Sequence, residues 1–154
     1  MSHPFYKRIL KEYRSLQKAT LPGIELVSNN EELSEFEFEM VVLNNHQLYK
    51  EPVKLIVKLT DEYPVAPPKV KFLQEVGAYD IPMHPHVYSN GHICLNLLGN
   101  DWTPACSIES ILLSLQSMLE SNTKQERPPD DARYVRYAPA YASASGFVYH
   151  DDSV

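Results

Sequence analysis

The residues best suited to chemistry lie between Ile81 and Ala105, in the stretch IPMHPHVYSNGHICLNLLGNDWTPA. Cys94 follows a turn sequence, Ser-Asn-Gly, and stands among polar loop residues instead of an apolar run. A thiol in this setting is typical of a nucleophile, because a thiolate attacks carbonyl carbon well and also leaves readily. Three histidines precede it and could exchange protons near neutral pH. They are His84, His86 and His92.

The same cysteine and three histidines allow two other interpretations. All four are zinc-ligand types, but the spacing H-x-H-x5-H-x-C matches no familiar zinc finger and the His-Pro-His run is stiff. A cysteine hydrolase would use His84 or His86 as its base, yet no acyl-hydrolase signature accompanies them. Cys106 stands at a predicted helix start and is interpreted as a small buried apolar residue. We therefore expect no metal and no cofactor.

Length and composition indicate one globular domain. The chain has 154 residues, enough for a single domain with a proper core and too few for two ordinary ones. Apolar residues make up 44% of the chain and charged residues 22%, which is typical of globular proteins. The 14 basic and 20 acidic side chains give a formal charge of −6. Non-specific nucleic-acid binding needs a basic surface, so we expect no nucleic-acid partner.

Cysteine content and hydropathy indicate a location in the cell. Two cysteines are too few for a disulfide framework and fit a reducing compartment. No apolar run approaches the roughly 18 residues of a membrane span. The N-terminal segment is too charged for a signal peptide. We expect a cytoplasmic or nuclear protein without a membrane partner.

Hydrophobic periodicity predicts an α+β fold. Residues 5–18 have apolar side chains at helical spacing, with a basic stripe that is either a solvated face or a docking surface for an acidic partner. Alternation of apolar and charged residues predicts successive strands, joined by short links. Short links favour an antiparallel meander, because parallel pairing needs a long crossover. The predicted strands cover 24–27, 35–42, 53–59 and 69–72.

The second half of the chain contains a long loop and two predicted helices. Residues 77–106 show little periodicity, and loops of this length in a compact domain are usually functional. Ser107 is a plausible N-cap for a helix with an apolar face, and a shorter helix covers about 130–136. The prolines between Tyr63 and Pro68 predict a stiff exposed link. We divide the chain into a core, 1–137, and a loose or irregular tail, 138–154.

Several motifs now occur in one order and spacing. These are the amphipathic N-terminal helix, Tyr63-Pro-x-x-Pro-Pro, His84-Pro85, Ser89-Asn-Gly-x-Ile-Cys-Leu and Trp102-Thr-Pro-Ala. Together they resemble the ubiquitin-conjugating enzymes over nearly the whole chain. The resemblance implies a four-stranded antiparallel meander sheet flanked by an N-terminal helix, a central helix after the active-site loop and a short C-terminal helix. It also implies that Cys94 carries ubiquitin as a thioester and passes it to amines.

The resemblance implies partners and their binding residues. The partners are ubiquitin, the ubiquitin-activating enzyme and RING-type ubiquitin ligases. Leu113 and Ser117, on the exposed side of the central helix, would hold the thioester-linked ubiquitin. Val65 stands where many ligase-binding members have an aromatic residue, which predicts weaker or more selective ligase binding. The residues implied for the activating enzyme and the ligase are Lys7, Arg8, Lys11, Pro64, Val65, Pro104 and Ala105.

The active-site loop departs from the family pattern at one position. In most members an Asn follows His-Pro, and here His86 stands there. His86 could donate to the oxyanion formed when an amine attacks the thioester, act as a base, or only brace the loop. His84 and Asn90 are assigned to loop support. The loop, Arg127-Pro-Pro-Asp and Tyr149-His-Asp-Asp together resemble a branch of the family associated with protein α-amino groups instead of lysines.

Acidity supports that acceptor. The pKa of an α-amino group is about 7.7–8.0 and that of lysine about 10.4, so near pH 7.4 roughly a quarter of α-amines but only about a thousandth of lysines are neutral. Lysine-directed members often have acidic gateway residues, meaning residues that line the opening to the thiol. Ungapped counting from Trp102 assigns Gln125 and Glu126 to this gateway, and Asp101, just before Trp102, is assigned to it as well. We therefore expect substrates with flexible N-termini. The alternatives are lysine-directed conjugation and a non-catalytic adaptor that binds ubiquitin or a ligase.

Overall fold

The computed structural model describes residues 3–18 and 20–139, and in these ranges it contains a four-stranded sheet and three α-helices. The predicted α+β fold is confirmed. The elements are α1 (Tyr6–Gln17), β1 (Ile24–Asn29), β2 (Glu35–Met40), β3 (Val53–Lys58), β4 (Lys69–Leu73), the short 3-10 helix η1 (Asn96–Leu98), α2 (Ile108–Glu120) and α3 (Asp131–Tyr137).

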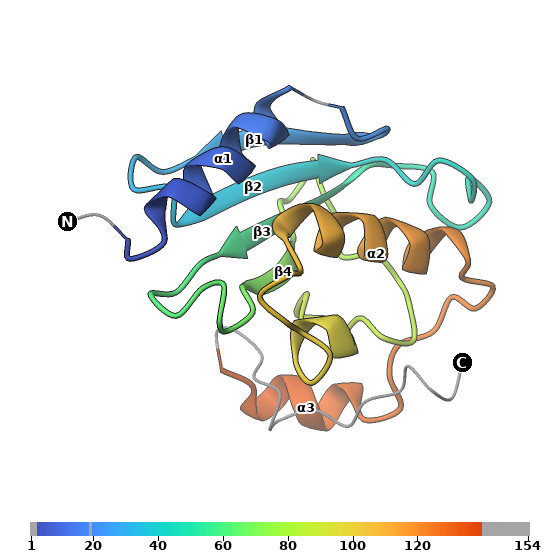
Figure 1. Cartoon of the computed structure of the whole chain (residues 1–154). Helices are drawn as coiled ribbons and strands as arrows, with labels where there is room; N and C mark the ends of the chain where they lie inside the picture. Colours follow the sequence, from blue (N-terminus) through green and yellow to red (C-terminus); the bar gives the residue numbers. More distant parts are fainter. Residues whose placement is uncertain (1–2, 19, 140–154) are drawn as a thin grey trace.

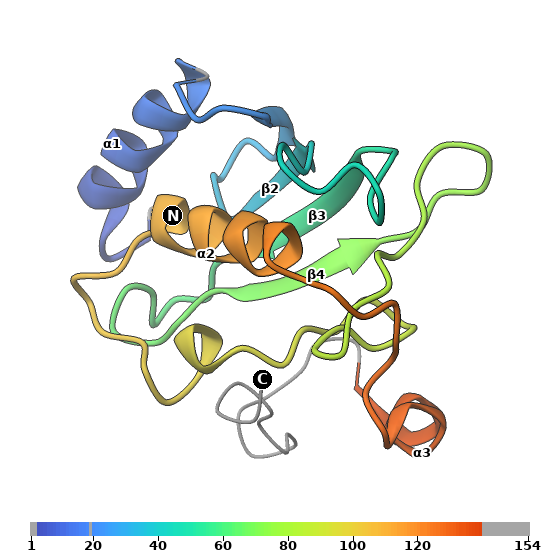
Figure 2. The same cartoon turned by 90° about the vertical axis from the view of Figure 1, so that its right-hand side faces the viewer.

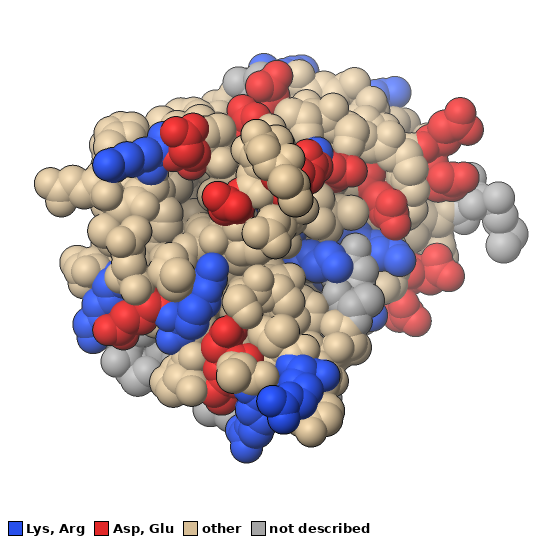
Figure 3. Space-filling view, turned by 180° about the vertical axis from the view of Figure 1, so that it is seen from behind, with Lys and Arg blue, Asp and Glu red and all other residues tan. Residues whose placement is uncertain are grey.

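The sheet is an antiparallel meander in the order β1-β2-β3-β4, as predicted (Figure 1). Alternate residues of β2, such as Phe36 and Phe38, point into the core and are fully buried. The glutamates between them point to the opposite face, because successive side chains of a strand alternate. On that face Glu37 pairs with Lys54 of β3 at 3.0 Å. Figure 3 shows the molecule from behind, with acidic and basic side chains interspersed among other residues over this side.

Helices α1 and α2 cover the apolar face of the sheet (Figure 2). Ser107 caps α2 by accepting a hydrogen bond from Ser110 N, which confirms the predicted helix start. The apolar side of α2 has no exposed surface, so it forms the centre of the core together with β2 and β3. Its buried residues include Ile108, Ile111, Leu112, Leu115 and Leu119.

The proline-rich link after β3 is stiff, but the prediction that it is exposed is wrong for most of it. Tyr63 is completely buried, and Pro64 and Pro68 are buried as well. The Tyr63 ring lies 5.8 Å from that of Trp102, whose indole Nε1 donates to Pro64 O at 2.8 Å. Only Val65 extends well into solvent, with 66% of its surface exposed. Aromatic packing, which the proline pattern does not encode, buries the link.

Helix α3 lies apart from α1 and α2, at the end of the molecule that carries the long loop (Figures 1 and 2). Within residues 3–18 and 20–139, no helix is long and apolar enough to cross a membrane. The predicted tail from 138 onward lies outside the described residues except for Ala138 and Pro139.

Candidate active site

A tight turn at Gly91 fixes the segment that leads to Cys94. Gly91 has φ +92, a left-handed conformation that favours glycine, and its carbonyl accepts from Phe72 N of β4 at 2.9 Å. A Cβ at this position would lie 2.1 Å from Phe72 O, so no side chain fits. Asn90 closes the turn through its Oδ1, which accepts from His92 N at 3.1 Å. The turn is therefore attached directly to the sheet.

His84 is a buried, neutral residue that ties the loop to α2. Its Nδ1 accepts from His86 N at 2.9 Å, so Nε2 carries the proton and faces Met118 O at 3.3 Å. Burial, followed by the nearby His86 imidazole, lowers the pKa of His84 to about 4. The ring is consequently uncharged at neutral pH, and both of its nitrogens are used for structure.

His86 lies directly across the loop from the cysteine. Its carbonyl accepts from Cys94 N at 2.8 Å, next to the bridge between Val87 and Ile93. Its ring makes an edge-on contact with the ring of His84, with 5.2 Å between centroids. Only 4% of His86 is exposed, so an acceptor amine does not reach it from solvent in this conformation. The backbone of His86 thus positions Cys94.

The Cys94 side chain has no exposed surface, although its thiol is not part of a disulfide. The polar loop residues around Cys94 in the sequence thus do not leave its thiol open to solvent in this conformation. Neighbouring Val87, Tyr88 and Ile93 are also buried. Thioester formation at this position requires a local opening. Cys106 is only half-buried and packs against the edge of the core.

A group of residues that sequence analysis did not assign to the site comes from the start of α3. The Tyr88 hydroxyl donates to Asp130 Oδ1 at 3.0 Å, and Ser89 N donates to Asp131 Oδ1 at 2.8 Å. The Tyr134 ring stacks on that of Tyr88 with 3.9 Å between centroids. The run Arg-Pro-Pro-Asp-Asp before a predicted helix was the available sequence signal. Its spatial partner could not be known without the fold.

Arg127 explains why α3 reaches the loop. Its guanidinium donates to three backbone carbonyls, those of Ile81, Pro82 and Val87, at 3.1, 2.6 and 3.1 Å. These contacts turn the chain after α2 back across the active-site loop, so that the following aspartates meet it. Burial lowers the pKa of Arg127, but a guanidinium still remains charged at neutral pH.

The residues assigned to the gateway lie on separate segments, Asp101 after η1 and Gln125 and Glu126 after α2. Gln125 Nε2 donates to Leu48 O, in the link between β2 and β3, at 3.2 Å. Asp101 is exposed after η1, and its backbone N donates to Asn96 O. Glu126 is exposed. The carboxylates that accept hydrogen bonds from the active-site loop are those of Asp130 and Asp131.

Two of the histidines considered as zinc ligands have other partners in the structure. Both nitrogens of His84 face protein atoms, and His92 Nδ1 lies 2.8 Å from the Tyr134 hydroxyl. Across residues 3–18 and 20–139, no three His, Cys, Asp or Glu side chains gather in an arrangement that could hold a metal ion.

Comparison with known proteins identifies the family of this chain. The ubiquitin-conjugating enzyme family model matches residues 8–144. The chain belongs to the ubiquitin-conjugating enzyme family. It is 37% identical to ubiquitin-conjugating enzyme E2 W of Caenorhabditis elegans, with complete coverage of both chains. It is 38% identical to probable ubiquitin-conjugating enzyme E2 W-A of Danio rerio, over 96% of each chain.

Solved structures agree with this assignment. The crystal structure of the ubiquitin-conjugating enzyme E2 UbcA1 from Agrocybe aegerita matches with a TM-score of 0.81 and 42% identity, covering 88% of this chain and 95% of the other. The protein is therefore a ubiquitin-conjugating enzyme of the E2 W type, a transferase that works through a thioester intermediate. Family membership implies ubiquitin, an activating enzyme and a ligase as its partners.

In a ubiquitin-conjugating enzyme α1 is expected to face partners, but Arg8 is largely committed within the protein. Its guanidinium donates to Pro104 O and Cys106 O, bonds to Glu12 at 3.2 Å and lies over the Tyr63 ring. Glu12 also accepts from the Tyr63 hydroxyl at 2.7 Å and from the first backbone N of α2 at 2.9 Å. Arg8 and Glu12 thus connect α1, the loops that hold Tyr63 and Pro104, and α2.

The side chains expected to contact a ligase divide into exposed and buried ones. Val65, Pro104 and Ala105 are exposed on two adjacent loops. Pro64 is buried and accepts the Trp102 indole hydrogen bond, so its ring is not available to a partner. The buried Tyr63–Trp102 pair supports these loops from below.

The other partner residues are on helix surfaces. Lys7 and Lys11 are exposed on α1, as a docking surface requires. Leu113 and Ser117 are exposed on α2, and 42% of Leu113 is open to solvent, which is unusual for leucine in a helix that otherwise forms core. These exposures allow the partner contacts that the family resemblance implies.

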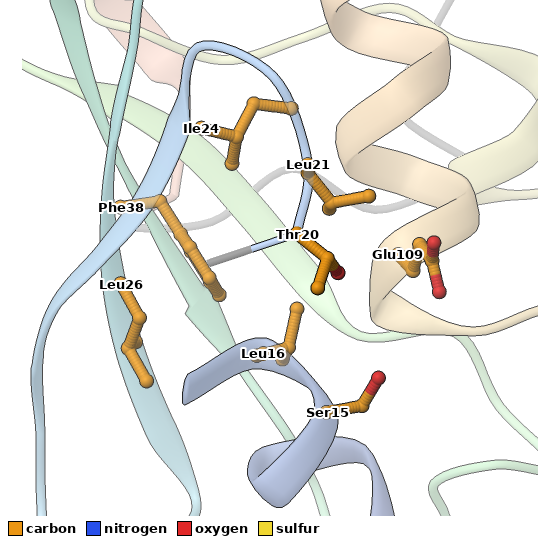
Figure 4. Close-up of a pocket in the computed structure, with 8 residues that line it drawn as sticks. All are labelled: Ser15, Leu16, Thr20, Leu21, Ile24, Leu26, Phe38 and Glu109. Atoms are coloured by element: carbon orange, nitrogen blue, oxygen red, sulfur yellow. The ribbon is translucent and has the colours of Figure 1, made fainter. Parts of the chain in front are cut away.

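Among the described residues, two of the hollows lie beside α1, and neither of these is lined by the Cys94 loop. The smaller leaves about 10 Å³ between the end of α1, β1 and α2, close to the space of one water molecule (Figure 4). The larger, of about 310 Å³, lies between α1 and the start of α2 and is lined by charged groups including Lys11 and Glu109. Access to the thiol is therefore not through either hollow.

Proposed function

We propose that this enzyme carries ubiquitin as a thioester on Cys94 and transfers it to the α-amino group of flexible protein N-termini. The observation that carries the proposal is the position of His86. It replaces the usual Asn, is buried, and pairs through its backbone with Cys94. The relatives named E2 W support the same assignment by their similarity over the full chain.

The carboxylates beside the loop favour an acceptor that is already neutral. Asp130 accepts a hydrogen bond from the Tyr88 hydroxyl, and Asp131 accepts one from Ser89 N. Both acids therefore already accept hydrogen bonds from donors of the protein itself. An α-amino group needs a base less than lysine does, because its lower pKa leaves roughly a quarter of it neutral near pH 7.4. The site thus favours the more acidic amine.

His86 can act at the step where charge develops. Attack by an amine places negative charge on the thioester oxygen, and a ring N–H directed at that oxygen would stabilise it. An imidazole is also a base near neutral pH and could accept the proton that the amine loses. The amine nitrogen forms the new amide bond, and the Cys94 sulfur leaves as a thiolate. Both roles require the loop to open from its buried conformation.

A discharge assay with paired peptides tests the proposal. Enzyme charged with ubiquitin is mixed with one of two peptides that differ only at the N-terminus and at one position. The first peptide has a free N-terminus and an arginine at that position, and the second is N-acetylated and has a lysine there. We expect transfer to the first at least about tenfold faster, as the neutral fractions indicate. Cys94→Ala is the control and should form no thioester.

The variant His86→Asn separates the acceptor from the carrier. It restores the residue common in the family and should increase transfer to the lysine peptide relative to the N-terminal one. Equal or faster transfer of ubiquitin to lysine by the unmodified enzyme overturns the preference for α-amines while leaving conjugation intact. Normal charging of Cys94→Ala overturns the role of the cysteine.

A further inference from the structure

Tyr134 connects α3 to the loop that holds Cys94. Its ring stacks on Tyr88 with an interplanar angle of 22° and 3.9 Å between centroids. It makes an edge contact with His92, and its hydroxyl lies 2.8 Å from His92 Nδ1. Tyr88 and His92 are 0% and 2% exposed, and Cys94 is 0% exposed. The residue thus contacts both sides of the turn that precedes the sulfur.

Electrostatics indicate that both phenol groups lie close enough to Cys94 to interact with it. Burial and the charge of a Cys94 thiolate, in that order, raise the pKa of Tyr134 to about 12. Burial, hydrogen bonding to Asp130 and the same thiolate raise the pKa of Tyr88. A negative charge on the sulfur disfavours ionisation of both phenols, as expected for acidic groups that lie near one another.

We infer that Tyr134 is a positioning residue that controls access to Cys94: its ring must leave Tyr88 and His92 before the thiol can be charged with ubiquitin. This rests on the proposed role of Cys94. An opening of this kind agrees with the burial of a thiol that belongs to a thioester-forming family.

The attachment of α3 favours local opening without global unfolding. The helix has seven residues, none of them buried, and follows the Pro-Pro pair at 128 and 129. Its described contacts with the turn are the stack and hydroxyl of Tyr134, together with the bonds of Asp130 and Asp131. Segments with few buried contacts open at lower free energy than the core.

Alkylation of the thiol measures this access without ubiquitin. The full chain is prepared with Cys106→Ser, so that Cys94 is the remaining cysteine, and its reaction with iodoacetamide is followed by intact mass. Tyr134→Phe keeps the stack and removes the hydroxyl, and about a fivefold faster reaction is expected. Tyr134→Ala removes both and should react more than about tenfold faster. The control is Tyr137→Ala, on the same helix and 78% exposed, which should react at the original rate.

The outcomes distinguish access from chemistry. Equal rates for the original chain, Tyr134→Phe and Tyr134→Ala overturn the inference, as does equal acceleration by Tyr137→Ala. Circular dichroism checks the fold, and if Tyr134→Ala unfolds, the folded Tyr134→Phe decides. Faster alkylation should be accompanied by faster charging from the activating enzyme. Faster alkylation without any ubiquitin adduct would support the access role and overturn the proposed function instead.

Discussion

Replacing Gly91 by alanine should damage the active-site loop more than the same change at another left-handed glycine. Gly91 and Gly77 have φ +92 and +82, so alanine at either costs about 1–2 kcal/mol of backbone strain. They differ in space: a Cβ at Gly77 meets nothing within 4 Å, whereas one at Gly91 lies 2.1 Å from Phe72 O. The turn must then move away from β4.

That movement breaks the hydrogen bond from Phe72 N to Gly91 O and displaces the backbone that positions Cys94. The bond contributes about 0.5–1.5 kcal/mol, and the full effect of Gly91→Ala should reach about 3 kcal/mol. For a chain of this size that corresponds to a fall in Tm of roughly 10 °C, against about 4 °C for Gly77→Ala. Charging of Cys94 should slow only in the Gly91 variant.

Urea unfolding and differential scanning calorimetry of both variants measure the difference. Equal losses of stability at the two glycines would refute the argument from the Phe72 carbonyl. A destabilised Gly91→Ala that still charges at the original rate would show that the turn does not position the cysteine.

Three further predictions concern polar side chains that hydrogen-bond to distant segments. The pKa of His84 is about 4 in the folded state, below its ordinary 6.5, so its contribution to stability is present above pH 6.5 and is lost as pH falls toward 4. Urea unfolding should show a loss on the order of 3 kcal/mol over this pH range, and the loss should be smaller in His84→Asn. The same pH dependence of stability in both proteins would contradict this. Glu12→Gln should cost about 2 kcal/mol and reduce ligase-stimulated discharge more than unstimulated discharge, since Glu12 orients Arg8 beneath the Pro104 loop; equal reduction would mean that the ligase surface is unaffected. Arg127→Met should cost about 2–3 kcal/mol by leaving three carbonyls unsatisfied, and Arg127→Lys should recover part of that; melting of both variants at the original temperature would argue against the anchor.

The helices and strands were accessible from local sequence. Apolar and charged residues alternate along β2 and β3 with period two, and α2 has an apolar face behind the capping residue Ser107. Such patterns are local because each element buries one face whatever its partner is. Short links between strands then left the antiparallel meander as the simplest topology, and the sheet has that order.

The surroundings of the cysteine were only partly accessible. The sequence indicates a reactive thiol near histidines and a turn, because these residues are close along the chain. It did not indicate that Cys94 is fully buried, that Pro64 lies beneath Trp102, or that Arg8 binds the carbonyls of a loop almost a hundred residues away. These depend on long-range packing, which has no fixed spacing in sequence.

By itself, then, the sequence determined the element order and the thiol at the centre of the loop, since both are encoded by residues within a few positions of one another. The tertiary structure alone decided which acids meet that loop. Arg127 draws the chain after α2 across the carbonyls of residues 81–87, and this brings Asp130, Asp131 and Tyr134 to the turn before Cys94. Hydrogen bonds between distant segments, rather than local periodicity, fix that arrangement.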